Sequence, residues 1–136
     1  MRVRHRTERR TILEGAAPTP YEAVIHEAAL RIMVGERAAS RDQLSALLSL
    51  TEANHITVRV TPFDLERFAG AASAMTYAGG AVPKPDTVVR DAPQGAAFID
   101  SEAQLNAFRT FFRKVMDVSL DPVRSGDLIH KLRKEL

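Results

Sequence analysis

The chain has 136 residues, of which 45% are apolar and 26% are charged, and it contains no cysteine. This length suits one domain with a substantial core, and the composition is that of a folded globular protein. The absence of cysteine excludes a disulfide framework, a thiolate metal site and a thiol nucleophile. No apolar run reaches the roughly 18 residues of a membrane span, and no signal-peptide pattern is present, so we expect a cytoplasmic protein with no membrane association.

The positive charge is concentrated at the N-terminus. Residues 1–10 hold five arginines and one glutamate, a net charge of +4, whereas the whole chain carries +2, so residues 11–136 sum to −2. A nucleic-acid-binding domain normally spreads lysine and arginine over one face of its fold. The body of this chain lacks that excess of positive charge. We therefore expect no specific nucleic-acid binding by this domain alone.

Residues 1–15 predict a basic helix. The segment has helical propensity, ends at Gly15 and is followed by two prolines. Its apolar residues are too few for a free-standing amphipathic helix; they are Val3, Ile12 and Leu13. We expect them to need a partner surface, and a homodimer with twofold symmetry is the commonest way to supply one.

The following segment predicts a strand, a helix and a second strand. Residues 21–27 are β-branched at their centre and suit a short strand, with a turn or short helix after them. Ser40 and Gln43 form a capping box ahead of leucines at helical spacing. Residues 55–63 alternate apolar and polar side chains, which indicates a strand with one buried face.

The second half of the chain predicts three more strands and two helices. Residues 70–80 suit a strand between glycines, and residues 86–91 and 95–100 suit a hairpin. A second capping-box pattern opens a helix over residues 101–120. Asp121 followed by proline is a helix N-cap with proline at the first helical position, and it opens the final helix.

These elements predict a single α+β domain over residues 16–136. We expect one small, mostly antiparallel sheet of four or five strands. Helices should cover one face of it, namely the two C-terminal helices and the helix that starts near Ser40.

No catalytic or metal-binding motif is present. The four histidines lack the i, i+4 spacing of a helical metal pair, and the glycines form neither a P-loop nor a dinucleotide fingerprint. No G-x-S-x-G elbow occurs either. We expect no metal and no cofactor. The sequence favours a non-enzyme, although an active site assembled from scattered residues stays open.

A run of small residues surrounded by aromatic residues indicates a ligand pocket. Residues 70–80 are mostly glycine and alanine, which leaves volume beside their strand. Two arginines lie in the middle of predicted strands, where a charge needs water or a partner, and either could hold the anionic or carbonyl end of a ligand. In the alternative, a helix fills this space and both arginines point to solvent. The candidate ligand-binding residues are Arg59, Phe63, Phe68, Met75, Tyr77, Arg90, Phe98 and Phe111.

Four stretches together resemble a known family. Its most specific parts here are EAALR after the first strand, the second strand ending in TPF, and the S-x-D-L-I pattern of the last helix. The chain is similar, over essentially residues 9–136, to the C-terminal domain of unknown function that follows an XRE-type helix-turn-helix in actinobacterial, WhiJ-like or antitoxin-like transcriptional regulators. The stretches are YEAVIHEAALRIMVG (21–35), QLSALLSLTEANHITVRVTPF (43–63), FAGAASAMTYAGG (68–80) with DTVVRD (86–91), and GAAFIDSEAQLNAFRTFFRKV leading to SLDPVRSGDLIHKL (95–132).

The resemblance implies a regulatory domain that dimerises and senses a small-molecule effector or meets a partner protein, and it carries over no catalytic residues. In that family the arginine-rich segment is a linker helix arriving from the DNA-binding domain. The chain lacks the helix-turn-helix pattern, so we expect the regulatory part of such a transcription regulator without its DNA-binding half. The alternative is a stand-alone small enzyme or ligand-binding protein of a specialised-metabolite pathway that reuses this fold.

The charge distribution predicts the outcome of a DNA titration. The isolated chain should show no sequence-dependent binding to duplex DNA at near-physiological salt, because residues 11–136 carry a net charge of −2. Weak binding that salt abolishes would report only the N-terminal arginines. Tight binding that depends on the DNA sequence, measured by fluorescence anisotropy, would contradict the prediction.

Overall fold

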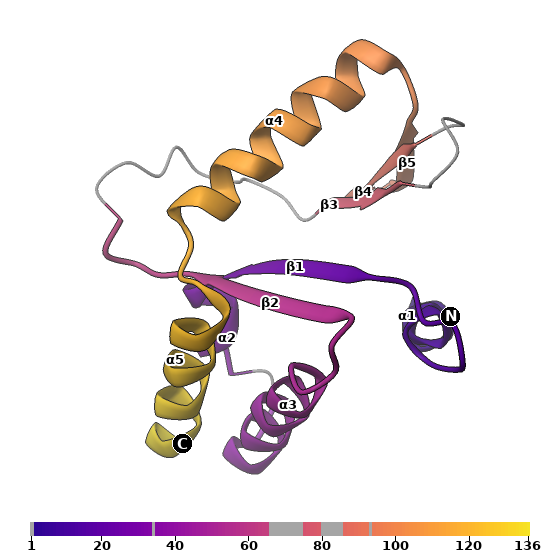
Figure 1. The fold of residues 1–136 in the computed structure, drawn as a ribbon. Coiled ribbons are helices and arrows are strands. Elements are labelled where there is room, and N and C mark those ends of the chain that lie inside the picture. Colours follow the sequence, from indigo (N-terminus) through magenta and orange to yellow (C-terminus); the bar gives the residue numbers. More distant parts are fainter. Residues whose placement is uncertain (1, 34, 66–74, 80–85, 93) are drawn as a thin grey trace. The chain divides into compact units, whose positions relative to one another are not determined.

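The computed structural model is an α+β protein whose described residues form two compact units (Figure 1). Unit 1 comprises Met1–Leu65 and Ser119–Leu136, and unit 2 comprises Glu66–Val118. Each unit has its own small sheet. The structure describes residues 2–33, 35–65, 75–79, 86–92 and 94–136.

The sheet of unit 1 is a parallel pair of strands. Strand β1 (Tyr21–His26) pairs with β2 (Ile56–Thr61), from Tyr21 opposite Ile56 to His26 opposite Thr61. Parallel neighbours need a crossover connection. Here it contains α2 (Glu27–Arg31) and α3 (Arg37–Leu50), so the chain leaves β1 directly into a short helix.

The core of unit 1 lies between this sheet and two helices. Helix α5 (Pro122–Glu135) packs on β2 and on α3. The predicted alternation of β2 is confirmed, because its apolar side chains are buried on one face. The buried core residues are Leu44, Leu48, Ile56, Val58, Val60, Ile129 and Leu132.

The N-terminal segment is helical and is fastened to unit 1. Helix α1 (Arg2–Arg9) continues into a 3-10 helix, η1 (Arg10–Leu13), and Gly15 then turns the chain with a φ of +95°. Leu13 packs against the core, and its carbonyl lies 2.8 Å from Nε2 of His55. One of the three apolar residues that we expected to need a partner surface is therefore used within the chain.

Unit 2 contains an antiparallel sheet and one helix. Strands β3 (Met75–Ala78), β4 (Thr87–Ala92) and β5 (Gly95–Ile99) lie in that order, so β4 is central. Helix α4 (Glu102–Val118) contacts β4 and carries the buried Leu105, while β4 carries the buried Val88. The predicted β4–β5 hairpin is confirmed.

The prediction of one mostly antiparallel sheet of four or five strands is wrong. The described strands form two sheets, and that of unit 1 is parallel. Alternating hydrophobicity identifies a strand and its buried face but does not specify the strand beside it. The chain crosses over through α2 and α3, so that β1 and β2 lie side by side in parallel orientation. Residue periodicity does not predict this pairing.

The caps of the helices differ in how well the sequence predicted them. The Asp121 cap is confirmed, since its carboxylate accepts the N–H of Arg124 at 2.8 Å. The Ser40 cap is wrong, because α3 begins three residues earlier and the N–H of Ser40 donates to the carbonyl of Glu36 inside the helix. Good helix formers ahead of Ser40 extend the helix past the expected cap.

Among the described residues, no helix is both long enough and apolar enough to cross a membrane.

Ser125 joins the start of α5 to the end of β2. Its side chain is fully buried, and its hydroxyl accepts the N–H of Val60 at 2.9 Å and donates to the carbonyl of Leu120 at 3.1 Å. The N–H of Leu120 in turn donates to the carbonyl of Val60 at 2.9 Å. These bonds close a ring that joins the start of α5 to β2.

Replacing Ser125 with alanine should lower the free energy of unfolding by about 1–3 kcal/mol, because it leaves a buried main-chain N–H without an acceptor. Urea unfolding followed by far-UV circular dichroism measures the change. Ser49→Ala on the exposed side of α3 is the matched control and should change stability by no more than about 0.5 kcal/mol. Equal losses for the two variants would contradict this role of Ser125.

Candidate functional site

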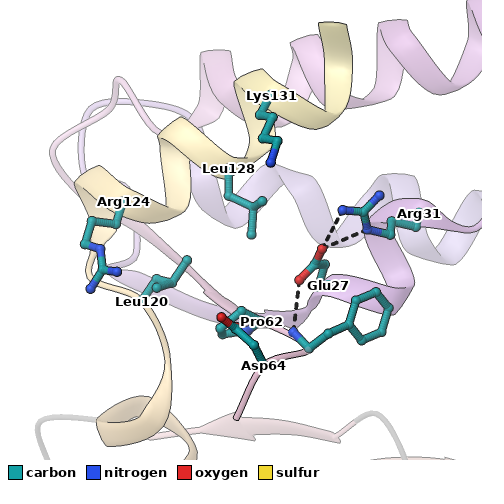
Figure 2. Close-up of a pocket in the computed structure, with 9 residues that line it drawn as sticks. Glu27, Arg31, Pro62, Asp64, Leu120, Arg124, Leu128 and Lys131 are labelled. Atoms are coloured by element: carbon teal, nitrogen blue, oxygen red, sulfur yellow. Dashed lines mark hydrogen bonds and ion pairs between the residues drawn. The ribbon is translucent and has the colours of Figure 1, made fainter. Parts of the chain in front are cut away.

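An open pocket of about 390 Å³ lies in unit 1. The motifs EAALR and TPF each contribute two residues to its lining, and the S-x-D-L-I pattern contributes one. The motifs that carry the family resemblance, far apart in the sequence, thus meet around one cavity (Figure 2). The lining residues are Glu27, Arg31, Pro62, Phe63, Asp64, Leu120, Arg124, Leu128 and Lys131.

Glu27 is a buried carboxylate in the lining of the pocket. It is the first residue of α2, only 6% exposed, and it joins two segments. Its Oε1 accepts the Nε–H of Arg31 at 2.8 Å, and its Oε2 accepts the main-chain N–H of Phe63 at 2.9 Å. Burial by itself raises the pKa of this carboxyl. The hydrogen bonds from Phe63 and Arg31, with the charge of Arg31, outweigh burial and hold the pKa below its usual value of 4.5.

Phe63 and Arg31 form one wall of the pocket. The ring of Phe63 meets that of His26 edge-on, with centroids 5.5 Å apart, and the guanidinium carbon of Arg31 lies 5.9 Å from the Phe63 centroid. Phe63 nevertheless remains 57% exposed. Arg31 also reaches Glu135 at 3.4 Å, so its charge is shared between two carboxylates. This wall offers an accessible aromatic surface beside a cation that already has partners.

Helix α5 forms the opposite wall. Arg124, Leu128 and Lys131 recur at helical spacing and all line the pocket. In Figure 2, Leu128 and Lys131 extend from α5 toward the side of the pocket where Glu27 and Arg31 lie. Within the described part of the chain, the side chains of Arg124 and Lys131 have no hydrogen bond or ion pair, so both charges are available to a ligand.

Of the predicted site residues whose side chains the structure describes, the pocket contains Phe63 alone. Arg59 lies on β2, and its Nε is buried without a hydrogen-bond partner among the described residues. Phe68 lies outside the described residues, and for Met75 only the main chain of β3 is described. The remaining four lie in unit 2: Tyr77, Arg90, Phe98 and Phe111.

Tyr77 belongs to a polar cluster within unit 2. Its hydroxyl donates to Oδ2 of Asp86 and accepts the Nε–H of Arg109 at 2.5 Å, while Arg109 also contacts Asp86 at 2.6 Å and Glu102 at 3.1 Å. Burial, and then the hydrogen bond to Asp86, raise the pKa of the Tyr77 hydroxyl. The cluster connects β3, the residue that precedes β4, and α4, and Tyr77 is one of its members.

Sequence analysis missed Glu27, Arg124 and Lys131. The glutamate and arginine of EAALR stand at i, i+4, which is the spacing of a helical ion pair, and this signal was available. Nothing in the sequence indicated that the main-chain N–H of Phe63 would donate a hydrogen bond to the Glu27 carboxylate. For the α5 cations the sequence gives helical spacing alone, which is equally typical of a solvated helix face.

Metal ligation is not evident in the part of the chain that the structure describes. There, no three His, Asp or Glu side chains come together in a way that could hold an ion.

Comparison with known proteins identifies a family without an assigned activity. The model of the family described as "Domain of unknown function (DUF5753)" matches residues 1–131. No curated protein and no solved structure matches the chain.

The Glu27 carboxylate should make stability depend on pH. Because its pKa is lower in the folded chain than in the unfolded chain, it stabilises the fold above about pH 4.5 and loses this effect as the pH falls through the lowered pKa. Glu27→Gln should therefore cost about 2 kcal/mol at neutral pH, and its deficit relative to the unmodified chain should shrink in acid. Urea unfolding at a series of pH values measures both effects.

Glu52→Gln, at an exposed position, is the control for removing one negative charge and should keep the stability of the unmodified chain. A Glu27→Gln deficit that stays constant from neutral to acid pH would contradict the role of the ionised carboxylate.

Proposed function

We propose that the chain, which belongs to the family described as a domain of unknown function (DUF5753), is the effector-sensing or protein-interaction domain of an actinobacterial, XRE-type helix-turn-helix transcription regulator, as its sequence resemblance implies. Its pocket binds an anionic ligand that also has an apolar part, either a small-molecule effector or a segment of a partner protein. Such a regulator acts in the cytoplasm. The single observation that carries the proposal is that Arg124 and Lys131, which have no ion pair with any described residue, lie beside exposed apolar surface.

The charges around the pocket favour an anion. Arg31 is already engaged by Glu27 and Glu135, whereas Arg124 and Lys131 have no ion pair among the described residues. The seven-residue spacing of these two cations corresponds to about 10 Å along the helix axis. Charge-assisted hydrogen bonds to a carboxylate or phosphate are among the strongest polar contacts that a protein makes. An anionic group near either cation would gain such contacts without breaking an existing ion pair.

The apolar lining favours a ligand with a hydrophobic part. Leu128 lies between the two cations in the sequence of α5, and Phe63 presents an exposed ring from the other wall. Pro62 and Leu120 add further apolar surface. Binding pockets commonly combine such surface with a few polar groups that fix orientation. A purely polar anion would leave this surface in water, so the pocket suits an amphipathic one.

The position of the pocket suits a sensor. Its lining comes from α2, from the end of β2 and from α5, which are joined by the buried bonds of Glu27 and Ser125. A ligand held between α5 and the β2–α2 side stabilises their mutual arrangement by its binding free energy. A neighbouring DNA-binding domain or a partner protein that contacts these elements then responds to the bound ligand.

A matched set of probes tests the pocket. Decanoate should bind more tightly than decanol of equal chain length, and decyltrimethylammonium should bind least, when chemical-shift changes are followed by NMR. Replacing both Arg124 and Lys131 with glutamine should weaken decanoate binding by about tenfold or more, since each charge-assisted bond contributes on the order of 1.5 kcal/mol. Lys134→Gln, a cation of α5 that does not line the pocket, should leave the affinity unchanged.

Two results would overturn this assignment of ligand class. One is equal affinity for decanoate, decanol and the ammonium probe. The other is an unchanged decanoate affinity in the double variant. The regulatory half of the proposal has its own test: an in-frame helix-turn-helix in the genomic reading frame supports it, and a biosynthetic gene cluster without one favours the enzyme alternative.

A further inference from the structure

Among the described strands of unit 2, β5 lies at an edge of the sheet. In the order β3–β4–β5 it pairs with β4 on one side, and within the described residues no strand pairs with its other side. Edge strands present a row of main-chain N–H and C=O groups, and proteins usually shield them with charged residues, proline or a bulge. Gly95–Ile99 has the sequence GAAFI, with no charge and no proline.

The side chains of β5 are open to solvent as well. Its first four residues are exposed, and Phe98 is 73% exposed. Phe98 lies opposite Val89 of β4, so its ring stands on the same sheet face as Val89, and Ala96, two residues away on β5, shares that face. The strand therefore offers free main-chain groups at its edge and a large apolar side chain beside a small one.

This pattern is complementary to itself. If two copies of β5 pair in antiparallel orientation about a twofold axis through Ala97, Ala96 of each copy lies opposite Phe98 of the other. Each Phe98 ring then covers a small residue, and the two rings become diagonal neighbours within contact distance. Beyond the strand, Gln94 lies opposite Asp100, so no two like charges face each other.

We propose that β5 is a homodimer interface, at which two copies of the chain join their three-stranded sheets into one continuous six-stranded sheet. The occupant is a second copy because every pairing in this register is favourable or neutral and the contact closes on itself, as twofold interfaces do. The inference rests on unit 2 alone and does not depend on what the pocket of unit 1 binds.

Charge substitutions at Ala97 test the interface and its register. The unmodified chain should sediment as a dimer at high micromolar concentration. Ala97→Lys should weaken dimerisation more than about tenfold, because it places two like charges directly opposite one another, each beside the Arg90 of its own β4. Ala97→Glu should weaken dimerisation less, because each glutamate lies opposite the Arg90 of its own β4. An equimolar mixture of the two variants should recover the dimer, since the opposed charges are then opposite in sign. Ala46→Lys, at an exposed alanine of α3, is the matched control and should remain dimeric.

Cross-linking gives a second measurement that does not rely on charged variants being folded. The chain has no cysteine, so Ala97→Cys introduces a single thiol. Directly opposed residues of antiparallel strands lie within the Cα separation of a disulfide, and mild oxidation should therefore yield a covalent dimer. Ala46→Cys should stay monomeric on a denaturing, non-reducing gel.

Several outcomes overturn the proposal. These are a monomeric unmodified chain at high micromolar concentration, a dimer that Ala97→Lys leaves intact, a mixture that fails to recover the dimer, and absence of the Ala97→Cys cross-link. A dimer that Val3→Glu dissolves while Ala97→Lys does not would assign self-association to the exposed apolar residues of the N-terminal segment instead.

Discussion

The buried carboxylate of Glu27 is the contact on which the arrangement of unit 1 most depends. A charge that is 6% exposed is tolerable only when its partners replace the lost hydration, and here Arg31 and the main-chain N–H of Phe63 do so. One of these partners belongs to the same short helix, and the other follows β2 in the sequence. The carboxylate therefore holds the start of α2, just after β1, against the segment that follows β2.

Ser125 makes the corresponding connection on the other side of the pocket. Its hydroxyl is bonded to Val60 within β2 and to Leu120 just before α5, so the helix that carries Arg124 and Lys131 begins at a defined place on the sheet. Glu27 holds one wall of the pocket through an ion pair, and Ser125 holds the opposite wall through neutral hydrogen bonds. The open pocket between them is thus bounded by rigid elements although its surface is accessible.

The two units present different kinds of surface. Unit 1 has two cations without an ion pair in the described part of the chain, beside apolar side chains, which suits recognition of an amphipathic anion. Unit 2 has an uncharged strand edge with an exposed phenylalanine, which suits main-chain pairing. The polar cluster around Tyr77 and Arg109 connects β3 with α4 of unit 2, and it includes a tyrosine that the sequence had made a candidate for ligand binding.

The sequence by itself determined most of the local structure. Alternating apolar and polar residues identified β2, and turn residues between two short strands identified the β4–β5 hairpin. Asp121 and the proline after it identified the start of α5. Each of these signals acts over a few neighbouring residues. Only the tertiary structure decided that β1 and β2 are parallel partners, that the strands divide into two sheets, and that the candidate pocket lies between α2 and α5. Phe63 was predicted as a site residue and lies there, whereas Glu27 and Lys131 were not predicted. Both residues line the pocket because segments that are distant in the sequence pack together, and residue spacing carries no information about that packing.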